Sequence, residues 1–530
     1  MNKVFDYIRL SKVEQKAVFL IFIVATFALS SLLIANVLYS DDFTRVTTGE
    51  TFWNDNGRPL SSLVSILLQL GQPITDISPL PQILAFAIYA LSAVYLGKLF
   101  QIDNFLLLTL CGIIFVLNPF NLQNFTFVFD SFPMALAVLT SVLAAFVISI
   151  SFNLSLKKVE YIYSIGFGIL LIFSSLSLYQ AATSVYIVAC VFVALMELLN
   201  RSFQRSLRYL FTSILTLIAG LILYLPVKNY YITNSYNLYH SETVSVAQAI
   251  PQIVNNILAF WRSVQTSLGN SNLILSLIYL IFLAALLTIF FKAINKLNLK
   301  FKIKTLLLII CLLFYSLLLI VSPLGMMLIL KNPIFAPRTM MGFSTIVAIC
   351  CFFLAEQTLI FKQRQKTKYW LSAFFCVVIL AFSNVSFTLG NVLYSQNIQD
   401  EIIATVLISD LGEIVPQLPI SLQHPTLAVV NSLDYTYGNT KAYSKYPLLK
   451  EITWFYLKTN QIQFYTKLET LGFKFTRPHY EKHVYTSANN QFIPTKKPVV
   501  TRPLYNIYFE NDDLLVVVLH NPENHTNSTY

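Results

Sequence analysis

The sequence predicts a polytopic α-helical membrane protein, with about eleven transmembrane helices and a C-terminal soluble α+β domain. The 530 residues are 56% hydrophobic and only 12% charged, and this charged share is about half that of a typical soluble protein. Apolar runs of roughly 20 residues, each able to cross a bilayer, recur throughout residues 1–390. Residues 391–530 contain no such run. We therefore expect a transmembrane domain over 1–390 and a soluble domain over 391–530.

The apolar runs define the candidate spans. The first run follows a basic segment but is too long for the core of a cleavable signal peptide, so we interpret it as a span. The third run is short and ends at Asn118, because the residue before a proline disfavours helix. The predicted spans are 17–38, 82–99, 104–118, 133–152, 161–178, 183–199, 209–226, 272–291, 305–329, 340–360 and 369–390.

The net charge of +11 belongs to the membrane part. Residues 1–390 hold 25 Lys and Arg against 13 Asp and Glu, whereas 391–530 hold 11 against 12. A basic excess between transmembrane segments sets their topology and faces anionic lipid. We therefore expect membrane lipid as a partner and no nucleic acid.

The basic residues also predict the orientation of the chain. With the N-terminus in the cytoplasm, 19 basic residues lie on the cytoplasmic side of the spans and 6 lie outside. Basic residues collect in cytoplasmic loops. The long loops 39–81 and 228–271 are therefore expected outside, and so is the tail, because eleven crossings is an odd number.

Shorter periodic segments predict further elements. Phe43, Val46 and Phe52 are expected on one face of an interfacial helix, and apolar residues recur at helical spacing over 60–70 and 247–261. In the tail, the pattern predicts strands at 426–430, 504–509 and 514–519, with a turn at 510–513 between the last two. A tail helix is predicted over 453–471.

Metal chemistry has little support in the sequence. The six cysteines lie in or beside the apolar runs and form no Cys-x-x-Cys pair. His479 and His483 are four residues apart, which on a helix would suit a metal pair, but Pro478 indicates a surface loop instead. We expect no metal and no cofactor.

Charged residues predicted to lie outside form one candidate site. A carboxylate can accept a proton from a hydroxyl nucleophile, and guanidinium groups can bind a phosphate through paired hydrogen bonds. The alternative is structural, with Asp41 or Asp42 capping an interfacial helix and Arg45 reaching toward lipid headgroups. The cluster consists of Asp41, Asp42, Arg45, Asp55, Arg58, Lys331 and Arg338.

The first outside loop resembles a known family. The motif comprises Tyr39-Ser40-Asp41-Asp42 with Arg45, then Gly49, Trp53 and Gly57-Arg58-Pro59-Leu60. Residues 174–181 and Pro337-Arg338-Thr339-Met340 agree with it. This pattern resembles the bacterial O-antigen glucosyltransferases, the type II or Gtr serotype-converting enzymes. The resemblance covers most of residues 1–390, and the tail takes no part in it.

The resemblance implies a GT-C glycosyltransferase of the bacterial inner membrane, with its active site and tail on the periplasmic side. It implies a polyprenyl-phosphate-linked sugar donor, with glucose as the sugar, and an O-antigen or similar lipopolysaccharide glycan as the acceptor. A functional link to a flippase and to a polyprenyl-phosphate sugar synthase follows. Asp41 or Asp42 would be the catalytic base, and we prefer Asp42 because Ser40 and Asp41 suit a helix cap.

The resemblance also implies roles for the other candidate residues. Arg58 and Arg338, with Arg45 or Lys331, would bind the donor phosphate and stabilise the charge that develops on it. Two other classes stay open: an O-antigen polymerase or ligase, and a lipid-glycan transporter, which would carry charges within its spans. The residues expected to contact the sugar or the acceptor are Trp53, Tyr179 and Gln180.

Overall fold

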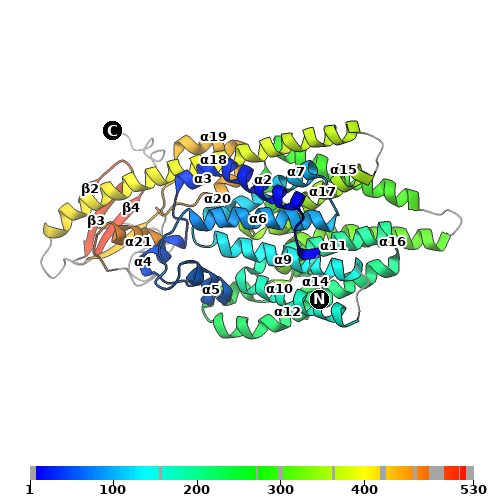
Figure 1. Cartoon of the computed structure of the whole chain (residues 1–530). Helices are drawn as coiled ribbons and strands as arrows, with labels where there is room; N and C mark the ends of the chain where they lie inside the picture. Colours follow the sequence, from blue (N-terminus) through cyan, green and yellow to red (C-terminus); the bar gives the residue numbers. More distant parts are fainter. Residues whose placement is uncertain are drawn as a thin grey trace.

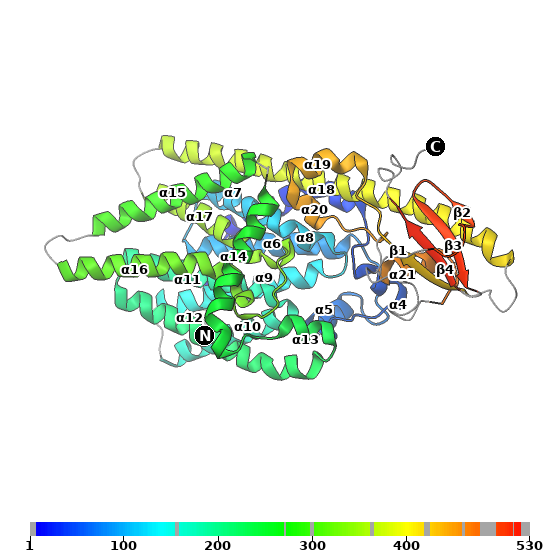
Figure 2. The same cartoon turned by 180° about the vertical axis from the view of Figure 1, so that it is seen from behind.

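The computed structural model describes residues 7–153, 158–269, 272–296, 302–360, 365–417, 425–457, 462–476, 494–511 and 514–520. Long helices run side by side along an elongated molecule, and a small sheet lies at one end (Figures 1 and 2). The chain is therefore a polytopic α-helical membrane protein, as the sequence predicts.

Within the described residues, nine helices are long and apolar enough to cross a membrane. Each of them overlaps a predicted span, and the last of them, α18, extends well beyond its predicted span. They are α6 (Leu80–Leu99), α9 (Ser131–Asn153), α10 (Lys158–Leu178), α11 (Thr183–Asn200), α12 (Phe203–Tyr231), α15 (Asn272–Lys296), α16 (Lys302–Val321), α17 (Met341–Ile360) and α18 (Gln365–Ile414).

The segment predicted as span 104–118 is bent. It comprises α7 (Phe105–Val116), the turn η2 (Pro119–Asn121) and α8 (Leu122–Thr126). The two helices meet at 51°. Pro119 explains the break, since proline cannot donate the backbone hydrogen bond that would continue α7.

The segment predicted as span 17–38 differs more. Helix α2 (Lys12–Ala28) starts earlier because Ser11 and Glu14 form a reciprocal capping box at its N-terminus. Its 17 residues cover only about 26 Å, less than a hydrocarbon core of about 30 Å. The chain then bends at Leu29 into α3 (Ser30–Ala35). By length, nine or ten of the eleven predicted spans can cross a membrane within the described residues, and α2 is too short to do so alone.

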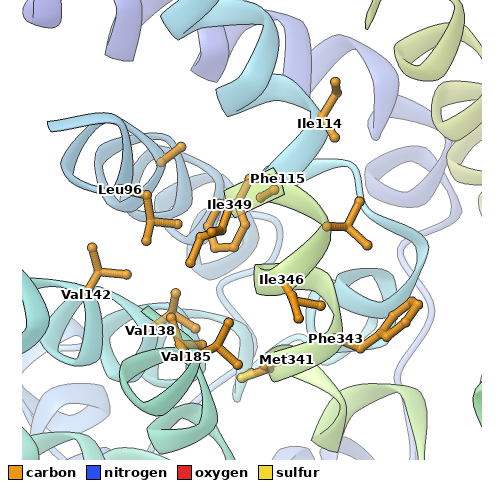
Figure 3. Packing of buried hydrophobic residues seen from close by; sticks show 14 of the residues in the cluster. Leu96, Ile114, Phe115, Val138, Val142, Val185, Met341, Phe343, Ile346 and Ile349 are labelled. Carbon is orange, nitrogen blue, oxygen red and sulfur yellow. The ribbon is translucent and has the colours of Figure 1, made fainter. Parts of the chain in front are cut away.

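The bundle has a buried centre and an apolar exterior. Helices α9, α11 and α17 are mostly buried, whereas most of α12, α15 and α16 is exposed and apolar. Figure 3 shows Val142, Val185 and Ile349 from the three central helices packing together with Leu96 of α6. This arrangement suits lipid around the outer helices.

Amphipathic helices lie in the two long loops. The predicted helix over 60–70 is confirmed as α5 (Pro59–Leu68), and that over 247–261 as α14 (Ala249–Leu268). Shorter helices are α4 (Asp42–Thr48), η1 (Asn54–Asn56) and α13 (Ser235–Ser241).

The predicted apolar face of Phe43, Val46 and Phe52 is wrong. Helix α4 ends at Gly49, whose φ of +72° is left-handed, so Phe52 lies beyond the helix. Phe43 is buried against Trp454 and Tyr456 of the tail, with ring centroids 5.8 Å and 5.5 Å away. The helix therefore faces the tail.

The tail contains a four-stranded sheet in the order β1-β4-β3-β2. Strands β1 and β4 are parallel, and the other two pairs are antiparallel. The three predicted strands are confirmed, and β2 is an addition. The strands are β1 (Thr426–Val430), β2 (Val500–Thr501), β3 (Tyr505–Asn511) and β4 (Leu514–Leu519).

Only part of the predicted tail helix over 453–471 forms. Helix α20 (Pro447–Ile452) ends before it, and α21 (Ile462–Thr470) occupies its second half. The residues between them in the described chain are not helical, because the Leu457 carbonyl accepts the Leu433 N–H (3.1 Å) across the tail. Asp512 and Asp513 of the predicted turn lie outside the described residues, and so do His479 and His483.

Helix α18 joins the bundle to the sheet. It has 50 residues and passes without a break through position 390, where the sequence predicts a domain boundary. Beyond that point, Leu407 and Leu411 pack in one cluster with the sheet. The segment with α19 (Thr440–Lys445) and α20 packs instead into the main core of the bundle, through Tyr443, Leu449 and Ile452.

Candidate active site

Asp42 lies buried at the start of the first long loop. The chain leaves α3 through Asn36 and turns at Ser40, both at positive φ. The Asp42 carboxylate then accepts N–H bonds from Tyr39 (3.1 Å), Val128 (2.9 Å) and Phe129 (3.3 Å). Burial raises the pKa of Asp42 to about 7, although Arg45 and these N–H groups favour the charged form. Asp42 thus fixes the first loop to the segment after α8.

Arg45 occupies the centre of a buried cluster. Its Nη1 lies 2.6 Å from an oxygen of Asp130 and 3.7 Å from Asp42, and its Nε donates to the Thr51 carbonyl (3.1 Å). The guanidinium stacks over Trp53 at 4.3 Å, and the Trp53 indole N–H donates to Asp130 (2.6 Å). Two carboxylates therefore compensate this one cation.

Three predicted site residues are thus internal to the loop. Asp42 and Trp53 have no exposed surface, and Arg45 is 2% exposed. A buried charge is stable only when it is paired and hydrogen-bonded, and the cluster provides both. Arg45 was expected to bind the donor phosphate, and Trp53 was expected to contact the sugar. Their burial in this conformation does not support either prediction.

Asp41 has the opposite environment. Its side chain is exposed and makes no capping bond to α4, so the predicted capping role is wrong. Ser40 Oγ lies 3.4 Å from Asp41 Oδ1, and Asp41 is close enough to Arg338 to raise its pKa. Of the two adjacent carboxylates, Asp41 is the one that is exposed to solvent and lies near Arg338.

Arg58 is held by residues 179–180, which follow α10. Its Nε donates to Gln180 Oε1 (2.9 Å), and its guanidinium lies 4.6 Å above the Tyr179 ring. The Gln180 amide nitrogen donates to the Asn56 carbonyl (2.9 Å) and to the Tyr224 hydroxyl (2.8 Å). These two bonds fix the amide so that its oxygen must face Arg58, whose Nη1 and Nη2 have no acceptor among the described residues.

Arg338 enters the same region from the loop before α17. Its backbone N–H donates to Gln123 Oε1 (2.9 Å), and its carbonyl accepts the Tyr179 hydroxyl (3.3 Å). The guanidinium lies 5.4 Å from the Phe127 ring and has no hydrogen bond or ion pair within the described chain. Tyr179 therefore contacts both arginines.

Arg338 lies close enough to Arg58 to perturb it. Burial lowers the pKa of Arg58, and the Arg338 cation acts in the same direction. Like charges in a poorly solvated site repel, and neither of these guanidinium groups has a carboxylate hydrogen-bonded to it among the described residues. An anion with several oxygens, such as a phosphate, would relieve the repulsion and accept the free N–H groups.

Lys331 is not part of this arginine pair. Its ammonium forms an exposed ion pair with Glu242 (3.0 Å), and its N–H donates to the Glu242 carbonyl (2.9 Å). These bonds fix the loop after α16 to the segment after α13. Among the described residues, no contact joins Lys331 to Asp41, Arg58 or Arg338.

Sequence reasoning missed Asp130 and Gln123. Asp130 is the only charged residue between Asp103 and Lys157, and a lone acid beside apolar spans is a signal that could have identified it. Gln123 offered no such signal, because its role depends on contacts with Tyr39 and Arg338, which are far away in the sequence. In the described part of the chain, no three His, Cys, Asp or Glu side chains are placed to hold a metal ion.

Comparison with known proteins identifies the family. The family model described as "Glucosyl transferase GtrII" matches residues 30–349, which include Asp41, Asp42, Arg58 and Arg338. A protein of Salmonella phage P22, described as "Uncharacterized 55.3 kDa protein in gtrB 5'region", is 27% identical over 425 residues, covering 78% of this chain and 81% of that protein. No solved structure matches. The chain belongs to the GtrII glucosyl transferase family.

Proposed function

We propose that this glycosyltransferase moves glucose from a polyprenyl-phosphate donor to an O-antigen glycan at the periplasmic face of the bacterial inner membrane. The observation that carries the proposal is the pair of arginines, Arg58 and Arg338. They share Tyr179, and their guanidinium groups lack an anionic hydrogen-bond partner among the described residues. Asp41 is the nearby exposed carboxylate.

The proposed reaction uses these groups as base and phosphate site. Asp41 accepts the proton of an acceptor hydroxyl, whose oxygen forms a bond to the anomeric carbon of the donor sugar. The bond from that carbon to the phosphate oxygen breaks, and its electron pair stays on the polyprenyl phosphate. Arg58 and Arg338 stabilise the negative charge that develops on this leaving group.

The difference in burial supports Asp41 rather than Asp42 as the base. The Asp42 oxygens are occupied by three N–H donors, so Asp42 has no surface on which an acceptor hydroxyl can approach. Asp41 is exposed beside Arg338. We therefore propose that Asp41 is the catalytic base and that Asp42 stabilises the conformation of the first loop.

Amphipathic helix α14 supports a donor carried by lipid. Asn256, Phe260 and Val264 face the protein, whereas Ile250, Val254 and Leu258 are exposed. A helix with one exposed apolar face lies in the membrane interface. A polyprenyl chain can therefore remain in the bilayer while its phosphate reaches the arginines.

The donor can be tested with the purified full chain in proteoliposomes and O-antigen as acceptor. We expect label to be transferred from polyprenyl-phosphate glucose and not from a nucleotide glucose in the absence of a synthase. Direct use of the nucleotide sugar would contradict the proposed donor. Transfer of a preassembled glycan chain in place of a single glucose would instead favour the polymerase or ligase class.

A further inference from the structure

A second site is suggested at the opposite end of the bundle. A shallow cavity of about 610 Å³, widely open to the outside, lies beside the first turns of α2. Helix α2 runs from this end toward the loop that carries Asp41, so the cavity is separate from the arginine pair. Helices α2 and α7 lie side by side here (Figure 1). The lining residues are Lys12, Gln15, Lys16, Phe19, Leu20 and Phe105.

The cavity carries positive charge that the protein does not compensate. Lys12 and Lys16 are exposed and lie one turn apart. Glu14 lies in the same turn, but its carboxylate pairs with Lys98 (2.9 Å) and accepts the Ser11 N–H (2.6 Å). Among the described residues, neither the Lys12 nor the Lys16 side chain has an ion pair or a hydrogen bond.

The other end of the cavity is apolar. Phe19 is 66% exposed, and Leu20 and Phe105 are also exposed. Seven residues separate Phe19 from Lys12, so the apolar end lies about 10 Å further along the helix axis. The opposite face of α2, with Ala17 and Ile21, is buried in the bundle.

We propose that this cavity binds an anionic phospholipid. Lys12 and Lys16 hold the phosphate, and Phe19, Leu20 and Phe105 pack against the first part of an acyl chain. The charge favours an anionic over a zwitterionic headgroup, since basic pockets at the ends of transmembrane helices recruit anionic lipid. The apolar end requires a lipid rather than free phosphate. Such a lipid would hold the short helix α2 in the bilayer.

Native mass spectrometry of the purified full chain in detergent tests the proposal. Phosphatidylglycerol and phosphatidylcholine are titrated separately, and inorganic phosphate is added as a competitor. We expect phosphatidylglycerol to bind more tightly than phosphatidylcholine and to resist phosphate. The Lys12→Gln/Lys16→Gln variant should bind phosphatidylglycerol about 30-fold more weakly, because it loses two charges beside the headgroup.

Two variants complete the test. Lys366→Gln/Lys368→Gln removes the same charge from the start of α18, where neither lysine lines the cavity, and should bind like the unmodified chain. Phe19→Ser keeps both lysines and should also weaken phosphatidylglycerol binding. Unchanged binding by Lys12→Gln/Lys16→Gln, equal binding of the two lipids, or full displacement by phosphate would each overturn the proposal.

Discussion

Asp41 and Asp42 are adjacent in the chain but differ in what their carboxylates can do. Asp42 accepts three backbone N–H bonds and has no exposed surface. Asp41 is exposed and lies near Arg338. Substitution of the two residues should therefore have different consequences, one for turnover and the other for folding.

Asp41→Asn should reduce the rate of glycan modification by about 10²–10⁴-fold, the usual effect of losing a general base. The amount of protein in the membrane should not change, because the Asp41 side chain makes no cap bond. The measurement is glycan modification in cells at matched membrane levels. Asp42→Asn should instead lower the amount of folded protein, since an amide nitrogen cannot accept the N–H bonds. A normal rate in Asp41→Asn would remove Asp41 from the chemistry.

Arg338→Lys and Arg58→Lys should each raise the KM for the donor by about 10-fold or more while leaving abundance unchanged. Lysine keeps the charge but loses the planar fork that binds two phosphate oxygens. Donor titration at saturating acceptor measures this effect. Arg262→Lys, on the exposed face of α14, is the matched control. Donor KM values equal to that of the control would show that the arginines do not bind the phosphate.

The sequence could identify the charged residues of the site but not their environments. The acidic residues and arginines of the first loop lie within a short stretch of sequence. The location of the site in this loop was therefore predictable. The choice between Asp41 and Asp42 depends on the N–H groups of Val128 and Phe129, which are about 86 positions away. Burial of Arg45 depends in the same way on Asp130. No local pattern contains these contacts.

At the scale of elements, hydrogen bonds from the tail stabilise the position of the loop that carries Asp41. The Tyr39 hydroxyl donates to the Ile452 carbonyl (2.5 Å) at the end of α20 and accepts from the Gln123 amide (3.0 Å). Gln123 in turn accepts the Arg338 N–H. One chain of hydrogen bonds thus links the tail, the first loop and one arginine.

Tyr39→Phe should lower the free energy of unfolding by about 1–3 kcal/mol, because it leaves the Ile452 carbonyl and the Gln123 amide buried without a partner. Thermal unfolding in detergent measures the change. Tyr437→Phe is the control, since Tyr437 is in the same tail but 85% exposed. Equal unfolding midpoints for the two variants would show that the Tyr39 bonds do not fasten the tail.

Gly390 marks a close contact between α18 and α3. A Cβ atom at Gly390 would overlap the backbone of Ser31 and Leu32, whereas one at Gly412 meets nothing within 4 Å. Gly390→Ala should therefore destabilise the chain by about 1–3 kcal/mol through overpacking. Gly412→Ala, in the same helix, should be neutral or stabilising, because alanine favours helix. The two unfolding midpoints should move in opposite directions, or only that of Gly390→Ala should move. Equal shifts would mean that the two helices are not in close contact.

Element boundaries were predictable where the signal is local. Apolar runs correctly predicted the positions of nine helices within the described residues. The pattern of apolar residues in the tail correctly predicted three strands. The start of α2 was locally readable too, as the capping pair Ser11 and Glu14, although the predicted span began five residues later. The order of the strands and the second half of α18 were not predictable, because they depend on contacts distant in sequence.

At the scale of the whole molecule, the orientation of the chain remains a prediction. The 19-to-6 distribution of basic residues places Lys296 in the cytoplasm and the tail in the periplasm. Alkaline phosphatase fused after Gln417 should be active, and the same fusion after Lys296 should be inactive. A cytoplasmic reporter at the two positions should give the reverse pattern. An inactive phosphatase after Gln417 would contradict the proposed topology.

Because α18 is one continuous helix, it restricts the insertions and deletions that can occur between the bundle and the sheet. From Gly390 to Ile414 the helix extends about 36 Å, and each inserted residue would turn everything beyond it by about 100°. One added residue would swing the sheet and α20 away from the first loop, whereas seven would restore their direction to within about 20°. Insertions in this stretch are therefore tolerable only in near-whole turns, and relatives that vary here should differ by such steps.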